Sequence, residues 1–226
     1  MKLSPKSILT LENINLHLKS EAGEIHILKN ISLDLPEGKT VSVIGPSGSG
    51  KTTLLMVLGG LEQPNSGKIT VVGHNLKSLS EDELAVFRRD NIGIVFQNFH
   101  LIPTMTALEN VAIPLEFAGR ADAFKIAHEA LHAVGLESRI KHYPGQLSGG
   151  EQQRVAIARA FATKPKLILA DEPTGNLDAK TGERVMNLLF TLCRENKTTL
   201  LLVTHDLGLA EQCDVNIHIK DGKIDA

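Results

Sequence analysis

Short apolar runs that end next to glycine or to an acidic residue recur along the chain and are typical of buried parallel strands. Residues 41–44, 167–170 and 200–203 are three such runs. Between the last two, apolar side chains recur at helical spacing over residues 180–194. Strands that alternate with helices in this way predict an α/β fold with a mainly parallel core sheet.

Both ends of the chain show a different pattern. Residues 8–18 and 25–35, with Gly23 between them, predict two antiparallel strands, and residues 69–72 before Gly73 predict another strand and a turn. Near the C-terminus, residues 215–219 are followed by Asp221 and Gly222, which predicts a terminal hairpin. We therefore expect an N-terminal antiparallel β-subdomain beside the parallel core.

The middle of the chain is predicted to be helical. Thr106 and Glu109 have the spacing of a capping box ahead of an apolar run, and residues 123–134 form a helical pattern that Gly135 ends. We expect residues 1–226 to form a single domain. In it, residues of about 1–98 and 163–226 form the core with its β-subdomain, and about 99–162 form an inserted helical subdomain.

Composition narrows the class of protein. The chain has 226 residues, of which 42% are hydrophobic and 22% charged, as in ordinary globular proteins. Its formal net charge of −2 opposes a nucleic-acid binder that relies on a strong positive field. Cys193 and Cys213 lack metal-site spacing, so we expect them to be reduced packing residues.

No stretch of about 20 apolar residues is present to cross a bilayer, and residues 1–6 do not begin a secretory signal. We expect the chain to stay where it is made and to reach a membrane only through a partner.

A glycine-rich segment follows the first predicted parallel strand and leads into an apolar helix. It fits the pattern G-x-x-x-x-G-K-[ST], with Thr53 next to it: Gly45, Pro46, Ser47, Gly48, Ser49, Gly50, Lys51 and Thr52. Its backbone N–H groups and the helix N-terminus favour an anion, Lys51 can reach terminal phosphates, and the Thr52 hydroxyl can ligate Mg²⁺. The alternative is a glycine-rich turn that holds no ligand, but strand, loop, lysine, hydroxyl and helix all agree on a nucleotide phosphate.

Two adjacent carboxylates, Asp171 and Glu172, end the strand at residues 167–170. Neighbouring side chains on a strand point to opposite faces, so the two can have different roles. Asp171 suits a Mg²⁺ ligand or its water shell, and Glu172 suits a general base for water that attacks a γ-phosphate. Alone, the pair could equally be two acids at the protein surface.

Ser148 and Glu151 also have capping-box spacing, at the start of a predicted helix. Gly149 and Gly150 are poor helix formers in its first turn, but they leave backbone N–H groups open to another molecule. The segment can therefore cap the helix and can also bind an anion, although it contains no phosphate loop. The two interpretations are compatible.

In this order, the phosphate loop, Leu-Ser-Gly-Gly-Glu-Gln and the Asp-Glu strand end resemble the ATP-binding subunit of an ABC transporter over essentially the whole chain. The resemblance implies a P-loop ATPase that forms a head-to-tail homodimer or pseudo-dimer with two ATP molecules at its interface. Each ATP would lie between the 45–52 loop of one subunit and residues 148–150 of the other. It also implies Mg²⁺, an integral membrane permease as partner, and a place on the cytoplasmic face of the inner membrane.

Three further residues match family motifs. Gln97 matches the glutamine that senses Mg²⁺ and the attacking water and links to the permease, Asp178 matches the loop that reaches across the dimer, and His205 matches the switch histidine that contacts the γ-phosphate. Outside this series, Gln97 would be an ordinary solvated residue, His205 incidental and Asp178 a helix cap.

The chain differs from the family in one feature. Members of the family often have an N-terminal aromatic residue that stacks on the adenine ring. No Phe, Tyr or Trp precedes Phe87, so adenine would rest on an aliphatic or imidazole surface near Leu16, His17 or Leu18. The apolar residues of 96–103 either fasten the helical subdomain to the core or form a groove for a short permease helix.

Residues 171–178 and 101–111 most resemble the lipoprotein-release and macrolide-export group, which includes the LolD, MacB and YbbA types, and the YbbA type most of all. The expected cargo is therefore lipophilic or belongs to the cell envelope. Alternatives are a soluble ABC-type ATPase of DNA repair or translation, the ATPase of an amino-acid importer, and a regulatory module without turnover.

Overall fold

The computed structural model describes residues 7–20 and 23–225, so the expectation about residues 1–6 lies outside the described residues. The described chain forms two compact units. The first contains the residues up to Arg88 and those from Thr198 onward, and the second contains residues 89–197.

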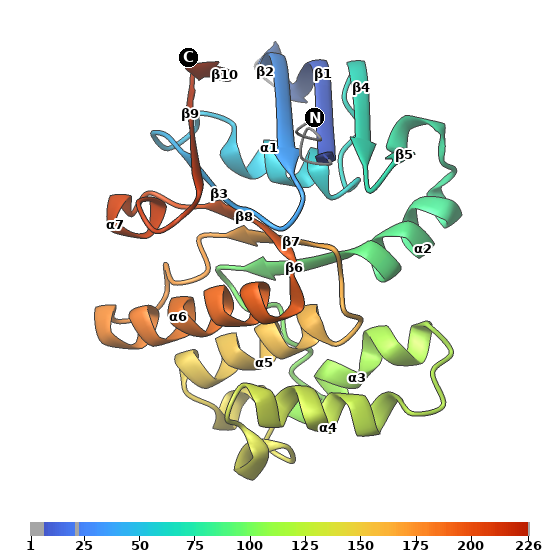
Figure 1. Ribbon diagram of the computed structural model, residues 1–226, viewed down its shortest axis with the longest axis vertical. Coiled ribbons are helices and arrows are strands. Elements are labelled where there is room, and N and C mark those ends of the chain that lie inside the picture. The colour runs from blue at the N-terminus through green and yellow to red at the C-terminus, as the bar shows by residue number, and fades with distance from the viewer. Residues whose placement is uncertain (1–6, 21–22, 226) are drawn as a thin grey trace, which may run out of the picture. The chain divides into compact units, whose positions relative to one another are not determined.

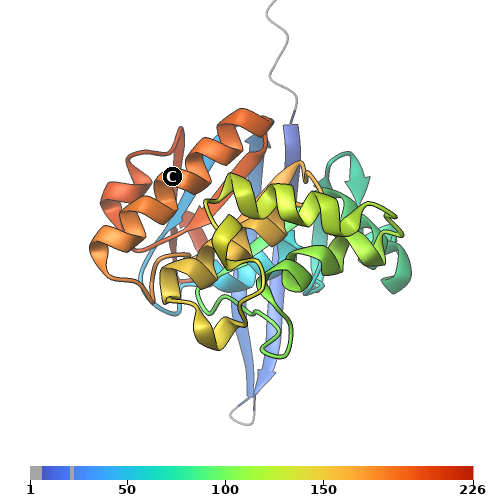
Figure 2. The same ribbon diagram turned by 90° about the horizontal axis from the view of Figure 1, so that it is seen from below.

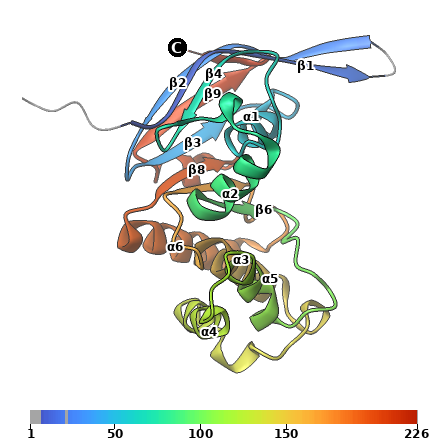
Figure 3. The same cartoon turned by 90° about the vertical axis from the view of Figure 1, so that its right-hand side faces the viewer.

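An antiparallel sheet of the first unit has the strand order β2-β1-β4-β5. Its strands are β1 (Ser7–Ser20), β2 (Gly23–Pro36), β4 (Ser66–Val71) and β5 (His74–Asn75). Figure 3 shows β1 and β2 as a long paired ribbon. Leu16 pairs with Leu28, and both side chains are buried, which fixes the register of the hairpin.

The first unit also contains the parallel strands expected around the phosphate loop. Strand β3 (Thr40–Ile44) pairs in parallel with β8 (Thr199–Val203) and with β9 (Val215–Lys220), and β10 (Lys223–Asp225) returns antiparallel to β9. Its helical segments are α1 (Lys51–Leu58), a 3₁₀ turn (Leu76–Ser78) and α7 (Leu207–Ala210). Helix α2 (Glu81–Asn91) contains the boundary between the units.

In the second unit, the parallel strands β6 (Ile92–Phe96) and β7 (Leu167–Asp171) pair with each other. Its helices are α3 (Ala107–Phe117), α4 (Ala123–Ala133), α5 (Gly149–Phe161) and α6 (Ala179–Asn196), with 3₁₀ turns at Glu137–Arg139 and Pro144–Gln146. Figures 1 and 2 show α3, α4 and α5 together, and each of the three contacts the other two.

These elements confirm the predicted α/β class with an antiparallel N-terminal sheet. Helices α3, α4 and α5 lie within residues 99–162, and the boundaries of a helical subdomain there remain a proposal. Among the described residues, Cys193 is buried and Cys213 half-buried, and neither forms a disulfide. Over the described residues, no helix is long and apolar enough to cross a bilayer.

One strand ends one residue earlier than expected. Strand β4 ends at Val71, and Val72 is in the turn, with φ 50° followed by φ 80° at Gly73. Val71 pairs with His74, so the hairpin loop has two residues, and such loops favour positive φ at both positions. The turn therefore includes Val72, which the β-branched run had placed in the strand.

Candidate functional site

The predicted phosphate loop connects β3 to α1. Gly48 and Gly50 adopt left-handed conformations, with φ 76° and 101°, which let the chain turn sharply before α1 begins at Lys51. Gly50 is the N-cap residue and supplies no side-chain cap, so no cap side chain competes for the N–H groups of the first turn. These N–H groups and the positive end of the helix dipole form an anion-binding cradle.

The inside of this loop also suits a phosphate. A Cβ atom on Gly45 would lie 2.0 Å from the Ile219 carbonyl oxygen, so only glycine lets the loop start against β9. The Ser49 hydroxyl is buried and has no hydrogen-bond partner among the described residues. Lys51 Nζ lies 2.9 Å from the carbonyl oxygens of Gly45 and Pro46, so its ammonium group sits over the loop. A phosphate would satisfy both the hydroxyl and the ammonium group.

His205 lies at the same sheet edge as the loop. Val43 of β3 pairs with Val203 of β8, so the loop and His205 follow neighbouring parallel strands at their carboxyl ends. The turn into His205 is anchored because Thr204 N donates to Val43 O at 3.2 Å. His205 itself is exposed, so the first unit brings a cationic loop and an accessible imidazole together.

The second unit brings Gln97 and Asp171 together. Phe96 of β6 and Asp171 of β7 are partners in the parallel register, so Gln97 follows directly beside Asp171 at the carboxyl edge. The amide oxygen and the carboxylate are ligand types that Mg²⁺ accepts.

Glu172 departs from the expected geometry. Strand β7 ends at Asp171, and Glu172 has φ 46°, so the idea that both carboxylates alternate along one strand is wrong. Gly175 N donates to Glu172 O at 2.9 Å and closes a tight turn. The left-handed conformation at Glu172 is what starts this turn, and non-glycine residues in it are concentrated at functional sites.

The sequence did not single out Asn176 as a site residue, but it contacts Gln97 directly. Gln97 Nε2 donates to Asn176 Oδ1 at 3.1 Å, and Asn176 Nδ2 donates to Gln97 O at 3.1 Å and to Asn98 Oδ1 at 2.7 Å. A Cβ on Gly175 would lie 2.6 Å from Gln97 Nε2. The glycine beside Asn176 therefore gives the Gln97 side chain its space.

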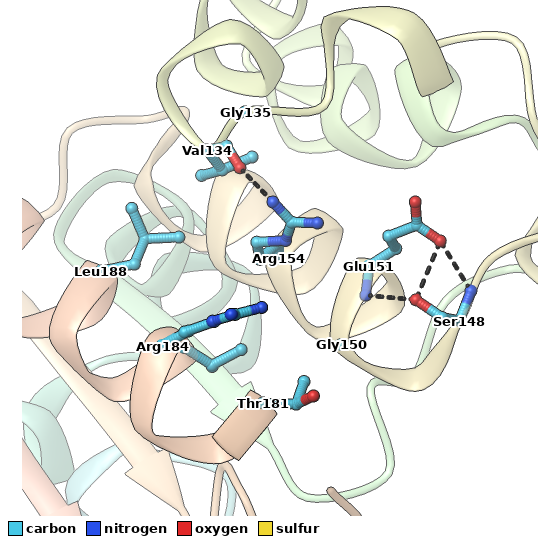
Figure 4. A pocket seen from close by; sticks show the side chains of 10 residues that line it. Val134, Gly135, Ser148, Gly150, Glu151, Arg154, Thr181, Arg184 and Leu188 are labelled. Carbon is cyan, nitrogen blue, oxygen red and sulfur yellow. Dashed lines mark hydrogen bonds between the residues drawn. The ribbon is translucent and has the colours of Figure 1, made fainter. Parts of the chain in front are cut away.

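Ser148 and Glu151 form the predicted capping box at the start of α5 (Figure 4). Ser148 N and Oγ donate to Glu151 Oε2 at 2.8 and 2.9 Å, and Glu151 N donates to Ser148 Oγ at 3.3 Å. The backbone hydrogen bond from Ser148 is the main cause that lowers the pKa of Glu151 to about 2, despite the opposing effect of burial; bonding and attraction from Arg139 add to the lowering. Ser148 remains exposed while it caps the helix, so the segment can be both a helix cap and an anion site.

The two glycines of this segment differ. Gly150 is buried, and a Cβ on it would lie 2.4 Å from Thr181 Cγ2, so it is needed for packing against α6. A cleft of about 540 Å³ borders this helix start and is lined by the beginnings of α5 and α6 and the end of α4. In Figure 4, the side chains of Arg154 and Arg184 point into it. The start of α5 is thus accessible to another molecule.

Asp178 is the N-cap residue of α6, which agrees with its alternative interpretation as a helix cap. Its Oδ1 accepts a hydrogen bond from Thr181 N at 3.0 Å. Hydrogen bonding to Thr181 lowers the pKa of Asp178, so the carboxylate stays charged at neutral pH. A role across a dimer is compatible with this cap because the residue is exposed.

In the β1–β2 hairpin, the His17 and His26 rings stack with centroids 3.9 Å apart and an interplanar angle of 13°. His26 Nε2 lies 3.1 Å from Asn15 Oδ1. Leu16 is buried and Leu18 is 37% exposed, so of the three positions considered for adenine, His17 alone belongs to a stacked ring surface. The paired imidazoles were not foreseen, because only the strand register brings positions 17 and 26 together.

The residues predicted to hold Mg²⁺ are three oxygen donors. Within the described ranges, no three or more His, Cys, Asp or Glu side chains gather in a metal-binding group. Mg²⁺ that arrives with phosphates needs only one or two protein ligands, and Thr52, Gln97 and Asp171 are oxygen donors of the required type.

Comparison with known proteins identifies the family. Residues 28–175 match the family model described as ABC transporter. The ABC transporter ATP-binding protein YbbA of Escherichia coli K12 is 47% identical over 214 residues, which cover 92% of this chain and 94% of YbbA. The lipoprotein-releasing system ATP-binding protein LolD 2 of Caulobacter vibrioides is 45% identical, with 96% of each chain covered.

A solved structure has the same fold. The ATP-binding cassette MJ0796 of Methanocaldococcus jannaschii, a dimer in a post-hydrolysis state bound to ADP and Pi, superposes with a TM-score of 0.89. Its sequence is 46% identical, and the match covers 96% of this chain and 97% of that one. These relatives do not favour the alternatives of DNA repair, translation or a module without turnover. The chain is an α/β P-loop ATPase and belongs to the ABC transporter family, in which it is an ATP-binding, ATP-hydrolysing subunit that powers a membrane transporter.

Proposed function

We propose that two copies of this chain bind ATP between them, head to tail, and that neither copy contains a complete reaction centre. Two separate segments support this proposal, because both the 45–52 loop and the Ser148 helix start have the features of an anion site. The dimeric state of the relative MJ0796 with ADP and Pi agrees with it.

Each proposed site residue has a distinct role. Lys51 and the loop amides of one subunit bind the β- and γ-phosphates, and Ser148, Gly149 and Gly150 of the other bind the γ-phosphate from the opposite side. Asp178 reaches across the dimer near the same phosphates. Because closure excludes water, these charge-assisted hydrogen bonds strengthen as the two subunits meet.

Glu172 is the proposed general base that takes a proton from the attacking water, while His205 contacts the γ-phosphate and Gln97 orients the water. When bound, Mg²⁺ neutralises charge on the phosphate oxygens. Thr52, Gln97 and Asp171 are the residues that would hold it.

The His17–His26 stack is the proposed surface for adenine, since a flat imidazole can stack on a base where no Phe, Tyr or Trp is available. The stack belongs to the same unit as the phosphate loop.

The transporter is proposed to act on lipophilic or envelope cargo, as the name of LolD 2 states for lipoproteins. A permease would hold this subunit at the cytoplasmic face of the membrane. The segment after Gln97 is the proposed docking site, and Ile102 is 38% exposed there. Crosslinking from residues 99–103 to a co-purified membrane protein would test that contact; crosslinks that stay within this chain would contradict it.

Mixing two inactive variants tests the shared site. Lys51→Ala removes the phosphate lysine, and Ser148→Asp keeps a good helix cap but places a negative charge against the γ-phosphate. In a mixed dimer, one of the two sites has both an intact Lys51 and an intact Ser148. Random mixing should therefore restore up to about a quarter of the parent turnover, because half the dimers are mixed and each has one intact site.

The matched control mixes Lys51→Ala with a chain that carries both substitutions. Neither chain then has Lys51, so no intact site can form. If the two single variants remain inactive when mixed, although they are shown to associate, each subunit contains its own complete site and the proposal is wrong.

A further inference from the structure

Helix α5 contacts the backbone on both sides of Gln97 through two polar side chains. Gln153 Nε2 donates to Phe96 O at 3.2 Å, one residue before Gln97. Arg159 donates from Nη1 to His100 O at 2.7 Å and from Nη2 to Phe99 O at 3.0 Å, just after it. The helix that begins after Ser148 thus brackets the loop of Gln97.

The loop that Arg159 holds has an unfavourable backbone conformation. Phe99 and His100 are consecutive non-glycine residues in the left-handed region, with φ 49° and 48°. Side chains disfavour this conformation, and it persists only where surrounding contacts enforce it. The two carbonyl groups of this turn are the ones that Arg159 binds, so the guanidinium group supplies such an enforcing contact.

The charge and planar shape of the guanidinium group explain why position 159 is an arginine. Arg159 is half-buried, and this burial lowers its pKa. Within the part of the chain that the structure describes, Arg159 makes these two carbonyl hydrogen bonds and no ion pair. Partial burial of a cation without a carboxylate costs free energy unless its N–H groups are hydrogen bonded. The planar guanidinium fork can bind two adjacent carbonyls, which an ammonium group cannot do in the same geometry.

Asn176 completes the restraint from the other side. It donates to Gln97 O and to Asn98 Oδ1, so the backbone from Phe96 to His100 is held at its start, middle and end. Gln153 is fully buried, and its burial together with the hydrogen bond to Phe96 O holds its side chain at the strand end.

We propose that Arg159 is a positioning residue, which by holding the Phe99–His100 turn keeps Gln97 in place for the Mg²⁺-bound nucleotide and keeps the Gln97 loop fixed relative to the helix of Ser148. This inference rests on the proposed role of Gln97. It predicts that loss of the two hydrogen bonds from Arg159 reduces the gain in nucleotide affinity that Mg²⁺ provides. The affinity for the nucleotide without Mg²⁺ should not fall.

The test uses Arg159→Gln and Arg159→Lys in the full chain. Calorimetry measures the Kd of a non-hydrolysable ATP analogue with and without Mg²⁺, and hydrogen exchange with mass spectrometry follows residues 97–103. We expect both variants to keep the Mg²⁺-free Kd of the parent, to lose most of the Mg²⁺-dependent gain in affinity, and to exchange faster in this segment. Arg159→Lys retains the charge, so it remains informative if Arg159→Gln folds poorly.

Arg154→Gln is the matched control, because Arg154 also lies on α5 and donates to a backbone carbonyl, Val134 O at 3.1 Å, away from the Gln97 loop. It should lower the melting temperature without changing the Mg²⁺-dependent gain. His100→Gly, at an exposed position, should partly rescue Arg159→Gln, since glycine adopts positive φ freely.

If the Arg159 variants change only the melting temperature, as Arg154→Gln does, or if Arg159→Lys behaves like the parent, the inference is wrong. Gln97→Ala separates this failure from failure of the proposed function. A Gln97→Ala chain with an unchanged Mg²⁺-dependent gain overturns the role of Gln97 and the inference together, whereas a loss in Gln97→Ala but not in the Arg159 variants overturns the inference alone.

Discussion

The side chains of Gln97 and Asn176 are hydrogen bonded to each other, with 3.1 Å between Gln97 Nε2 and Asn176 Oδ1. These residues are far apart in sequence and belong to the two segments proposed to sense Mg²⁺ and to reach across the dimer. Asn176 also binds the backbone of Gln97, so a shift of either segment must break contacts with the other.

The first prediction concerns this pair. Asn176→Ala should lower turnover by roughly 3–10-fold, because hydrogen bonds that hold Gln97 are lost and each contributes about 0.5–1.5 kcal/mol. ATP affinity should stay near that of the parent. Asn98→Ala, which removes only the contact to Asn98 Oδ1, is the control and should have a smaller effect on steady-state hydrolysis. Equal effects of the two variants would contradict the role given to the Gln97 contact.

Removal of the proposed general base is the second prediction. Glu172→Gln should lower turnover by about 10²–10⁴-fold while ATP binding is retained, because the amide cannot accept the proton. Gel filtration with ATP should then detect a stable dimer. Glu183→Gln, an equivalent change at an exposed position of α6, should hydrolyse ATP like the parent. Parent-level turnover in Glu172→Gln would remove this residue from the mechanism.

The third prediction concerns the phosphate loop. Lys51→Ala should weaken ATP binding by roughly 10–100-fold, since hydrogen bonds to charged groups contribute about 1.5–3 kcal/mol. Calorimetry measures the change, and Lys77→Ala, also in the first unit but exposed and distant in sequence, controls for the loss of one positive charge. Unchanged affinity in Lys51→Ala would exclude its proposed contact with the phosphates.

A fourth prediction follows from the lowered pKa of Glu151. Its ordinary pKa of 4.5 falls to about 2 in the folded chain, so the carboxylate stabilises the fold above pH 4.5 and this contribution is lost as the pH falls toward 2. Glu151→Gln should therefore reduce the free energy of unfolding by about 1 kcal/mol at pH 7, within the range of a helix cap, and by less at pH 3.

Urea unfolding at the two pH values measures this difference. Glu129→Gln on α4, an exposed position outside any capping box, is the control and should show no such trend. A destabilisation by Glu151→Gln that is the same at pH 3 and pH 7 would show that the charge of Glu151 is not the cause.

The fifth prediction tests the imidazole stack. Replacing both His17 and His26 by alanine should raise the Kd of ATP by roughly fivefold or more, because stacking on a base contributes about 1–3 kcal/mol. The Kd of inorganic pyrophosphate, which has no base, should not change. His74→Ala in the same unit is the control. A parallel loss of pyrophosphate binding would indicate damage to the fold and not to an adenine surface.

Much of the fold was predictable from local pattern. The strands β3, β7 and β8 and the helix α6 follow directly from apolar runs and helical spacing, and both the Thr106 and the Ser148 capping boxes form as predicted. Where the prediction was wrong, at Val72 and Glu172, the residue adopts a positive φ that its type disfavours. Such positions are imposed by the surrounding structure, so residue preference alone points the other way.

Residue patterns alone were sufficient to recognise the phosphate loop, the acidic strand end and the Ser-Gly-Gly helix start, and hence the family. Each of these is a contiguous segment whose function depends on local geometry. The contacts between distant residues became visible only in the folded chain. Examples are Gln97 with Asn176, His17 with His26, and Arg159 with the carbonyls of Phe99 and His100. Strand register and helix packing determine these contacts, and both depend on the whole fold, so no local pattern of residues encodes them.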